Sequence, residues 1–540
     1  MTYFIPQKSF PFYFPVKQKF LLILWLIGIV PFAKGQTPDW STGVATILYD
    51  NCVTCHHEGG IAPFSLMTYQ NAVDNAFSIQ ADVNARKMPP WPPDPNYTHF
   101  RNEMVLSSSE LATINEWVDN GTPEGDISLA PAPPVFNGVS VMQVIDDTLQ
   151  FPAYTITVPG DDYRAFAIHS NYTETRYLNQ IEFLPSNSAI VHHLFLLHDK
   201  TDVSWQQEVA DTAPGFYGGF LDGFSPYAVI DAGWIPGSSI FSMPYNMGIE
   251  IAPGSDFIVN VHYAPGSLGQ ADSIKVHLKW CDIPEDQVRK VRNNRLLHWH
   301  VPSLLNPPFE MPPYTITTFY ETSAVMDEDQ SLIALQPHMH LIGKSFEIYM
   351  VDANLDTTKI MYIPQWNFNW QMSYFLPKIM KVPVGSKILG TGVYDNTENN
   401  PFNPSNPPQW VYAGESTLDE MMSCRFWLMD YMPGDENIVL DSSYATGTGI
   451  PDFDRNKLSL TVFPNPVTDQ LQFMAWLPQH EVIWTLSNSL GTVIKSVKQS
   501  RIANGDYAQE IDLSKYPAGV YLLSVQSGNE KTTSKVMVMH

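Results

Sequence analysis

The chain has 540 residues, of which 44% are hydrophobic and 16% charged, and its formal net charge is −25 at pH 7. This length allows several domains, and the hydrophobic content excludes a chain that is disordered throughout. The 44 prolines and the 13% of aromatic residues favour a β-rich, loop-rich architecture over long surface helices. Nucleic acid is excluded as a partner, because a chain this acidic repels phosphates and has no basic stripe.

The N-terminus has the pattern of a secretory signal peptide. Lys17 precedes an apolar run over residues 20–30, and the small residues Ala33 and Gly35 follow at the positions that a signal peptidase recognises. The run is short for a membrane span. We expect residues 1–35 to be removed on export, with an uncleaved anchor as the alternative.

Residues 36–128 have a helical pattern. Ser107 and Glu110 form a predicted capping box, and the helix that they begin should end before Gly121. A proline-rich linker follows over residues 129–148. The sequence therefore predicts a small all-α domain before the linker.

The stretch "NCVTCHH" contains Cys52, Cys55 and His56 in the spacing C-x-x-C-H, the attachment signature of a c-type haem. Each thiol can add to a haem vinyl group, and His56 can then ligate the iron. Met88, in the rigid loop "RKMPPWPP", is the predicted second axial ligand. Two other methionines are alternatives for that role, Met67 and Met104.

The cysteine pair could instead be a thioredoxin-like redox motif or half of a zinc site. The first would need a βαβ pattern and the second another Cys/His pair nearby, and the sequence has neither. With "GGIAPFSL" and "MPPW", residues 40–126 resemble small cytochrome c domains. The resemblance implies one covalently bound haem c that transfers electrons.

Residues 149–441 consist of short β-branched and aromatic runs bounded by turn residues, which predicts antiparallel sheets. The block is too long for one ordinary sandwich. We expect two β-sandwich domains, over residues 149–283 and 284–441. A linker over residues 442–457 then leads to a last small β-sandwich over residues 458–540.

Three histidines in the first sandwich are candidate metal ligands. His192 and His193 are adjacent on one predicted strand, and His262 lies on a later one. Neighbours on a strand point to opposite faces, so a shared metal requires that the strand twists or ends there, or that the rings use different nitrogens. A single histidine of this kind is more often structural, and only the set suggests a metal.

The second sandwich carries the motif "QPHMHLIG". His338 and His340 are two residues apart and should share one strand face. A methionine of "LDEMMSCRF", Met421 or Met422, could complete a soft-ligand site. The motif "LLHWH" holds another pair, His298 and His300, which lacks partners and is expected to be structural.

The order of these motifs resembles the type II copper, ascorbate-dependent monooxygenases, which include the peptidylglycine α-hydroxylating and dopamine β-hydroxylating enzymes. The resemblance covers residues 150–440 and implies two jelly-roll-like domains that hold two copper ions. It implies an electron-transfer copper on His192, His193 and His262. It implies an oxygen-binding copper on His338, His340 and Met421, with Met421 preferred over Met422 because it directly follows Asp419 and Glu420. The implied partners are O₂, a small-molecule or peptide-like substrate, and an ascorbate-like reductant or redox protein.

The sequence departs from that family at two substrate positions. Gln336 stands where the peptide-hydroxylating enzymes carry an arginine that grips the substrate carboxylate, and Arg425 stands where they carry a tyrosine. These differences argue against a peptide C-terminus as substrate. Arg425 could recruit an anion, but a solvated or ion-paired arginine is the preferred interpretation. Cys281 and Cys424 could form a disulfide, which the sequence does not decide.

The last block contains "LTVFPNPVTDQLQF", "DLSKYPAGVYLLSV" and "SKVMVMH". Together these motifs resemble the type A C-terminal sorting domain of the type IX secretion system of Bacteroidetes. The resemblance implies the secretion machinery as a partner, and release or attachment at the outer-membrane surface.

The predicted protein is therefore an exported copper monooxygenase that hydroxylates a C–H bond and receives electrons through a fused haem domain. The alternative is a surface electron-transfer or copper-binding protein on the same scaffold, without hydroxylase activity. A hydrolase finds no support, because neither G-x-S-x-G nor H-E-x-x-H occurs.

Overall fold

The computed structural model is mostly β-sheet. It describes residues 37–136, 140–218, 225, 227–238, 240–244, 246–414, 416–441, 458, 460–463, 467–477, 481–488, 491–500, 505–528 and 530–539. The predicted signal peptide and the linker over 442–457 lie outside these residues. Within the described ranges, no helix has the length and apolar character needed to cross a membrane.

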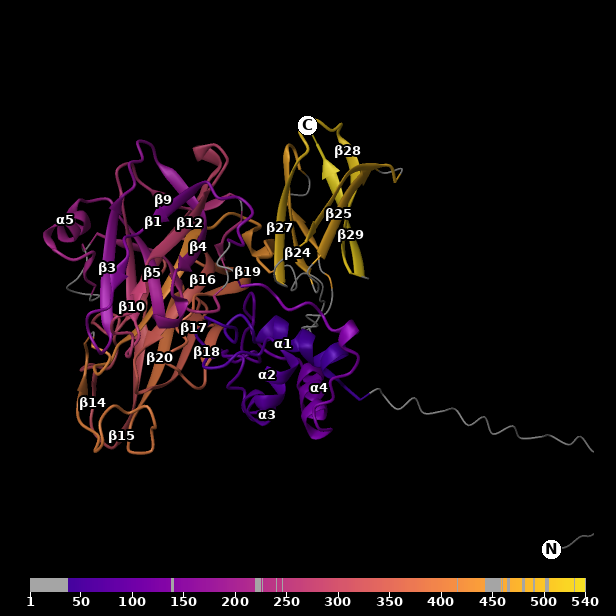
Figure 1. The fold of residues 1–540 in the computed structure, drawn as a ribbon. Helices are drawn as coiled ribbons and strands as arrows, with labels where there is room; N and C mark the ends of the chain where they lie inside the picture. The colour runs from indigo at the N-terminus through magenta and orange to yellow at the C-terminus, as the bar shows by residue number, and fades with distance from the viewer. Residues whose placement is uncertain are drawn as a thin grey trace, which may run out of the picture. The chain divides into compact units, whose positions relative to one another are not determined.

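Residues 37–136 contain helices and no strand (Figure 1). The helices are α1 (Ala45–Asn51), α2 (Tyr69–Asp74), α3 (Ala76–Asn84) and α4 (Ser108–Asp119), with single turns η1 (Trp40–Val44) and η2 (Ile127–Leu129) at either end. The predicted capping box is confirmed. The Ser107 Oγ accepts the Glu110 N–H at 3.2 Å, and the Glu110 carboxylate accepts the Ser107 N–H at 2.7 Å. Trp40 and Trp117 are fully buried in the core that these helices enclose.

A nine-stranded sheet runs through both halves of the β region. Eight strands follow one another in the order β1-β12-β4-β9-β13-β22-β16-β19, and β8 pairs with β4. The bounds in the first half are β1 (Asp147–Gln150), β4 (Arg176–Pro185), β8 (Phe241–Ser242), β9 (Met247–Ile251) and β12 (Ile274–Trp280). Those in the second half are β13 (Arg289–His298), β16 (Gln330–Met339), β19 (Tyr374–Val382) and β22 (Met422–Asp430).

The two halves are joined where β9 and β13 pair in parallel, with Arg289 opposite Met247. The expected boundary at 283/284 lies between β12 and β13, next to the turn η4 (Glu285–Gln287), but the sheet itself continues across it. The halves therefore share a sheet and are not two separate sandwiches.

A second sheet completes each half. In the first half the order is β6-β3-β10-β5-β7, and in the second half it is β15-β20-β17-β18. The first set is β3 (Asp162–His169), β5 (Val191–Asp199), β6 (Phe216–Tyr217), β7 (Val229–Trp234) and β10 (Asp256–Tyr263). The second set is β15 (Thr315–Thr322), β17 (Gly343–Val351), β18 (Thr357–Ile363) and β20 (Lys387–Asn396). The remaining short elements are β2 (Tyr154–Thr155) with β11 (Ala271–Asp272), β14 (Glu310–Met311) with β21 (Val411–Tyr412), helix α5 (Val203–Ala210), and turns η3 (Ser188–Ile190) and η5 (Asp435–Asn437).

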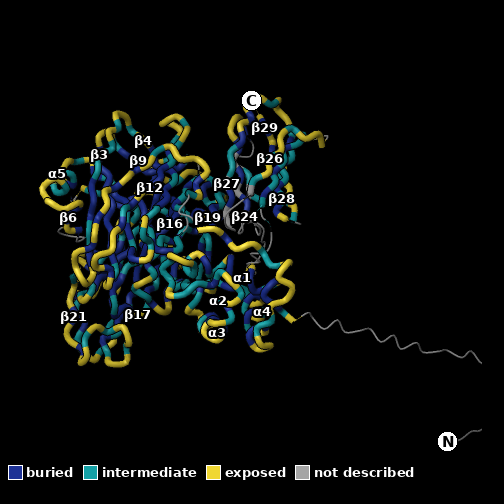
Figure 2. The backbone as a smooth tube through the Cα atoms, viewed as in Figure 1, coloured by how far each residue is buried: buried dark blue, intermediate teal, exposed yellow. Residues whose placement is uncertain are grey.

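Each half encloses an apolar core. Figure 2 marks many strand residues of both halves as buried. The two cores meet on β22, where residues alternate between them. Cys424 and Phe426 belong to the second core, whereas Trp427 and Met429 belong to the first. The Trp427 indole N–H also donates to the Asp231 carbonyl of β7 at 3.1 Å.

A stretch of the helical region packs on the second half. Phe100 is fully buried in that half's core. The backbone N–H of Asp94 donates to the Tyr362 carbonyl at 2.8 Å, and that of Arg101 donates to the Phe375 carbonyl at 2.8 Å. The chain that follows Met88 is therefore anchored on the β region.

The last block forms two small sheets, β23-β24-β27 and β26-β25-β28-β29. The strands are β23 (Thr461–Phe463), β24 (Gln470–Leu477), β25 (Glu481–Asn488), β26 (Val493–Ser500), β27 (Gly505–Asp512), β28 (Gly519–Ser527) and β29 (Glu530–Val538). Phe473, Trp484 and Leu523 are buried between them. The small β-sandwich expected here is present, while residues 464–466 of its P-N-P motif lie outside the described residues.

Candidate functional site

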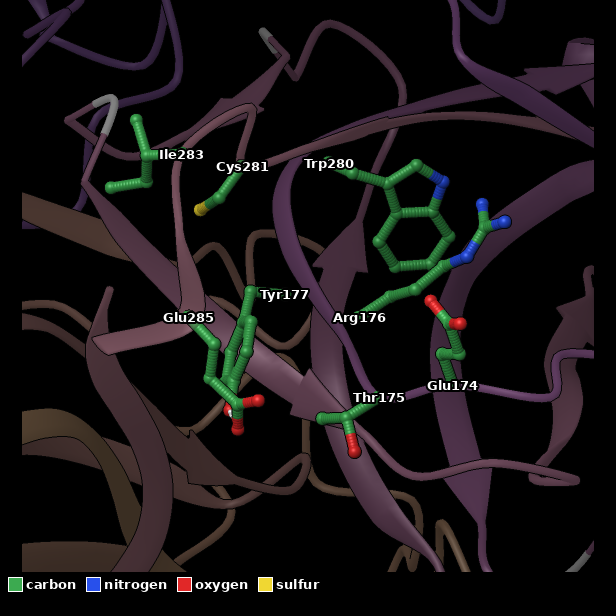
Figure 3. Close-up of a pocket in the computed structure, with 8 residues that line it drawn as sticks. All are labelled: Glu174, Thr175, Arg176, Tyr177, Trp280, Cys281, Ile283 and Glu285. Atoms are coloured by element: carbon green, nitrogen blue, oxygen red, sulfur yellow. Dashed lines mark hydrogen bonds between the residues drawn. The ribbon is translucent and has the colours of Figure 1, made fainter. Parts of the chain in front are cut away.

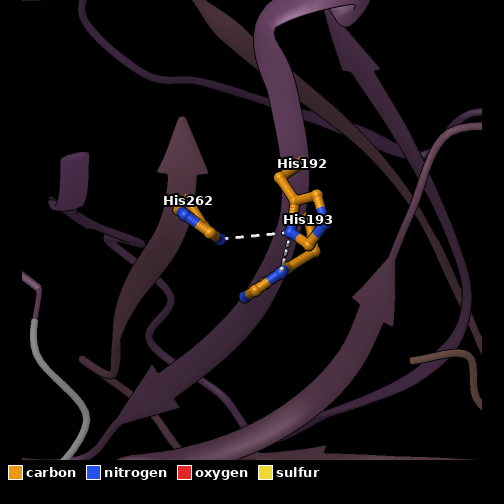
Figure 4. A group of neighbouring side chains, drawn as sticks. All are labelled: His192, His193 and His262. Atoms are coloured by element: carbon orange, nitrogen blue, oxygen red, sulfur yellow. Dashed lines mark hydrogen bonds between the residues drawn. The ribbon is translucent and has the colours of Figure 1, made fainter. Parts of the chain in front are cut away.

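The three histidines of the first half converge on one point (Figure 4). Their candidate ligand atoms all lie within 4.8 Å of one another. His193 pairs directly with His262, and a β-bulge at the next step lets Val191 pair with Tyr263, so His192 is the extra residue. A bulge interrupts the alternation of a strand. It therefore explains how adjacent histidines point the same way.

Hydrogen-bond acceptors on the outer side of this histidine set leave the unprotonated (bare) ring nitrogens facing its centre. The His192 Nε2 lies 2.9 Å from Asn369 Oδ1, and the His262 Nε2 lies 2.7 Å from Asp161 Oδ1. Because both oxygens are acceptors, each Nε2 carries the proton and each Nδ1 of the neutral ring is bare. These two Nδ1 atoms lie only 3.1 Å apart.

Two lone pairs at that distance repel each other unless a proton or metal ion lies between them. Imidazole nitrogens at about 2.0–2.1 Å from one shared ion lie about 3 Å apart. Burial, and then the charge of His262, lowers the pKa of His192 to about 4. Burial also lowers the pKa of His193. Since a metal binds neutral imidazole, this donor set fits a copper ion.

His338 and His340 form the second set, with the opposite nitrogen facing inward. The His338 Nδ1 donates to Gln371 Oε1, and the His340 Nδ1 donates to the Asp419 carbonyl at 3.0 Å. The Nε2 atoms are therefore the bare ones. Burial, and then the charge of His340, lowers the pKa of His338 to about 3, and burial also lowers the pKa of His340.

Met421 lies beside this pair. His338 is opposite Ser423 and Met339 is opposite Met422, so one further step in the same register sets Met421 opposite His340. The Glu420 carboxylate holds the two segments together by accepting the His340 N–H and the Ile342 N–H, each at 2.8 Å. Met422, like Met421, belongs to the second core, and its sulfur lies 2.7 Å from the position that a Cβ added to Gly392 would take. The choice of Met421 over Met422 rests on this register and stays a prediction.

One loop contacts both histidine sets. It runs from Trp366 to Gln371, between β18 and β19, and supplies Asn369 to His192 and Gln371 to His338. Between them, the Phe368 ring lies 5.7 Å from the ring of His192 and 5.8 Å from that of His340. The charges of His338 and His340 also lower the pKa of His193, after burial and its own neighbours. The two sets are therefore near neighbours on either side of Phe368.

The predicted haem ligands lie in the helical region. Cys52 and Cys55 are free, half-buried thiols. The His56 Nδ1 donates to the Phe64 carbonyl at 3.1 Å, which leaves its Nε2 bare for an axial bond. Among the described residues, the helical core includes Met67 but not the half-buried Met88. The two thiols and the bare Nε2 of His56 are donors that a haem c would use, and Met88 as the second ligand stays a prediction.

The remaining cysteines and the second H-x-H pair form no site in the part of the chain that the structure describes. Cys281 and Cys424 are both free, so the disulfide that the sequence left open is absent. His298 and His300 lie with ring centroids 5.7 Å apart, and in the described part of the chain they belong to no group of three or more candidate metal ligands.

Cys281 lines a separate pocket of ≈ 580 Å³ (Figure 3). In it the Tyr177 hydroxyl donates to the Glu285 carboxylate at 2.6 Å, and Arg176 lies over the Trp280 ring at 5.5 Å. None of the predicted site residues lines this pocket.

Comparison with protein families assigns two parts of the chain. Residues 306–446 match the family "Copper type II ascorbate-dependent monooxygenase, C-terminal domain", so this part of the chain is similar to copper-dependent monooxygenases, which are oxidoreductases. Residues 461–539 match the family "Secretion system C-terminal sorting domain". The protein is accordingly exported by type IX secretion of a Bacteroidetes-type bacterium and is secreted or held at the cell surface.

Whole-chain comparisons are weaker. No curated protein matches the chain. Among solved structures, it is similar to the glycosylasparaginase PNGase F from Flavobacterium meningosepticum, with 9% identity and a TM-score of 0.22 over 53% of this chain and 96% of that one. It is also similar to β-glucuronidase 3 from Bacteroides uniformis, with 9% identity and a TM-score of 0.12 over 42% of this chain and 27% of that one. Similarities this low do not bear on function.

Four residues that position the histidines could not be found by sequence reasoning: Asp161, Asn369, Gln371 and Glu420. Asn369 and Gln371 lie in "QWNFNWQ", which has no ligand spacing, and Asp161 lies in an ordinary turn sequence. Only the sequence "DEM" offered a signal, because Glu420 stands directly before the candidate methionine.

Proposed function

We propose that this protein is an exported copper-dependent monooxygenase that uses O₂ to hydroxylate a C–H bond, with electrons supplied through a haem c in residues 36–128. In this proposal the electron-transfer copper is held by His192, His193 and His262. The copper that meets O₂ and substrate is held by His338, His340 and Met421.

The observation that carries the proposal is the pair of oriented, neutral imidazole sets. The first presents bare Nδ1 atoms and the second bare Nε2 atoms, each fixed by a hydrogen bond on the other ring nitrogen. A nitrogen-only set and a set that adds a thioether differ in softness, so the two can differ in redox potential. The family match over residues 306–446 supports the same chemistry.

The reaction consumes one O₂, two electrons and two protons for each C–H bond converted to C–OH, and it releases one water. Copper bound at the two sets would supply one electron each and activate O₂. Phe368 and its loop keep the two sets close, and the buried surroundings of His338 and His340 exclude bulk water. The electrons come from an external donor, either an ascorbate-like reductant or a redox protein.

A contact between the helical region and the first half supports the haem as an electron entry. The Cys55 Sγ lies 3.9 Å from the Pro236 carbonyl. Pro236 follows β7, and Trp234 of β7 pairs with Leu194 of β5, next to His193. A haem attached at Cys55 would therefore lie against the chain that leads to the three-histidine set.

Metal content and turnover test the proposal together. The purified protein should bind two copper ions and one haem per chain, and the reduced protein should take up O₂ when a substrate is present. The Met421→Ala variant should lose O₂ uptake while it still binds copper at the first set. The exposed Met432 offers a matched control, since Met432→Ala should keep full uptake. One haem and no copper would contradict the proposal and leave a surface electron carrier, and uptake by Met421→Ala equal to wild type would overturn the oxygen-site assignment.

The haem relay has its own test. Cys52→Ala should lack covalently bound haem and should slow the reduction of copper by an external redox protein. Cys281→Ala, which removes a half-buried thiol outside the motif, should change neither. Unaltered reduction of copper in Cys52→Ala would eliminate the relay.

A further inference from the structure

Two exposed aromatic side chains lie side by side at β21. Val411 of this strand and its partner Met311 of β14 are both buried in the second core. Because side chains alternate along a strand, Trp410 and Tyr412, on either side of Val411, point away from that core. Their rings are nearly parallel, at 15°, with centroids 6.1 Å apart, and each residue is 50% exposed. This pair is here called the aromatic platform.

Buried amides hold the loop that leads into the platform. Asn396, which is fully buried at the end of β20, donates through its side-chain nitrogen to the Gln409 carbonyl at 2.7 Å and to the Met311 carbonyl at 2.9 Å. The Asn403 side-chain nitrogen donates in turn to the Asn396 Oδ1 at 2.9 Å. The residue before Trp410 is therefore fixed to the sheet. A ligand that binds to a surface already held in place orders few further groups, which favours its affinity.

The surroundings of the platform are polar but nearly uncharged. Residues 396–412 contain five asparagines and a single charged side chain, Glu398, whereas 16% of the whole chain is charged. Glu310 of β14 is paired with Tyr412 and therefore lies on the same face. Its carboxylate forms no hydrogen bond or ion pair in the part of the chain that the structure describes. The platform therefore combines aromatic rings with a free acceptor, and its own segment supplies no lysine or arginine to an anionic ligand.

Sugar rings have the chemistry that this surface matches. A pyranose with equatorial hydroxyl groups carries C–H bonds on its faces and hydroxyl groups at its edge. The C–H faces pack against the electron-rich faces of aromatic rings, and an edge hydroxyl can donate to a free carboxylate. In a β-1,4-linked chain the sugars follow one another along an extended ribbon, so neighbouring sugars can contact aromatic side chains two residues apart on a strand. An apolar protein segment would instead desolvate the Glu310 carboxylate without giving it a partner.

We propose that the aromatic platform binds a neutral, β-1,4-linked polysaccharide, with sugar rings stacked on Trp410 and Tyr412 and a sugar hydroxyl that donates to Glu310. The protein thereby anchors itself on a glycan after export. This binding goes beyond the proposed monooxygenase function and requires neither copper nor haem.

Calorimetric titration of the full chain with cellohexaose, chitohexaose and maltohexaose tests the proposal. The wild-type protein should bind at least one of the two β-1,4-linked hexasaccharides, and about tenfold more tightly than maltohexaose, whose α-1,4-linked chain coils away from a straight strand. Trp410→Ala should weaken this binding about tenfold, whereas Trp410→Phe, which keeps a flat ring, should retain most of it. Phe77→Ala is the matched control, because Phe77 is an exposed aromatic residue of helix α3, and it should bind like wild type.

Three results would overturn the proposal: no binding of either β-1,4-linked hexasaccharide, equal affinity for maltohexaose, or unchanged affinity in Trp410→Ala. Salt gives a second readout. Because the ligand is neutral, its affinity should be the same at low and high ionic strength, and a steep fall with added salt would mean that charge and not stacking holds it.

Sedimentation velocity tests a second copy of the chain as the occupant of the platform. Wild type and Trp410→Ala should sediment alike in the absence of glycan. A wild-type dimer that dissociates in Trp410→Ala would show that the rings are covered by a second copy, and would refute the glycan site.

Discussion

Asp161 should control copper binding at the three-histidine set although it does not contact the metal. It accepts the His262 Nε2–H at 2.7 Å, and this hydrogen bond lowers the pKa of the Asp161 carboxyl. In Asp161→Asn the amide can donate to His262 through its nitrogen, which would favour the tautomer with a protonated Nδ1. The metal would then compete with that proton.

The expected loss follows from the geometry. A hydrogen bond to a charged group contributes about 1.5–3 kcal/mol. The Asp161 side chain is 39% exposed, so water screens part of this. Partners that orient a metal-bound histidine are worth about 10–100-fold in affinity, or about 1.4–2.8 kcal/mol. We expect the lower half of that range, about 10–30-fold weaker copper binding at this set.

Competition with a chelator of known affinity measures the change. The exposed Asp327→Asn, which removes a carboxylate without a hydrogen-bonded histidine, should bind copper like wild type. If Asp161→Asn and Asp327→Asn bind equally tightly, the tautomer argument is refuted, and with it the claim that outer partners prepare the set for metal.

Three further perturbations follow from burial and partners. Burial holds the pKa of His338 at about 3, so the unfolded chain binds a proton at this histidine more readily than the folded chain, and the stability falls as the pH drops below about 6.5. Urea unfolding of the metal-free protein should show that this group makes the protein about 2 kcal/mol less stable at pH 5 than at pH 7. The His338→Gln variant should have a weaker pH dependence of stability. Trp427→Ala should cost about 3–5 kcal/mol in the same assay, because Trp427 is fully buried where the cores meet, whereas the half-exposed Trp410→Ala should have little effect. Gln371→Leu should weaken the copper affinity of the second histidine set about 10–100-fold and leave the affinity of the first set unchanged, as measured by a two-site copper titration. An equal loss of affinity at both sets would contradict the assignment.

The local signals in the sequence were good guides to the elements. The capping box at Ser107 begins a helix as predicted, and the β-branched runs between residues 149 and 441 are strands. The continuous sheet was not predicted, because the parallel pairing of β9 with β13 joins residues about 40 positions apart. Such pairing depends on tertiary contacts and leaves no periodic pattern in the sequence.

Part of the candidate site, like part of the fold, could be predicted from local sequence patterns. A period of two correctly placed His338 and His340 on one face, where their ring centroids lie 5.0 Å apart. The same alternation along a strand predicts that the adjacent His192 and His193 point to opposite faces, which argues against a joint site. The bulge at His192 interrupts the alternation and lets both side chains point the same way. A bulge is set by the partner strand, which local sequence does not reveal.

The sheet shared by both halves has a mechanical consequence. A protein whose two metal-binding halves are tethered by a flexible hinge could change the gap between them by swinging the halves apart. Here such a movement would break the strand pairing between Met247 of β9 and Arg289 of β13, and it would remove Trp427 from the core of the first half. The pairing and the packing therefore fix the distance between the two histidine sets once the chain has folded. In the proposed monooxygenase, room for a substrate would then come from local movement of the loop from Trp366 to Gln371, which contacts both sets.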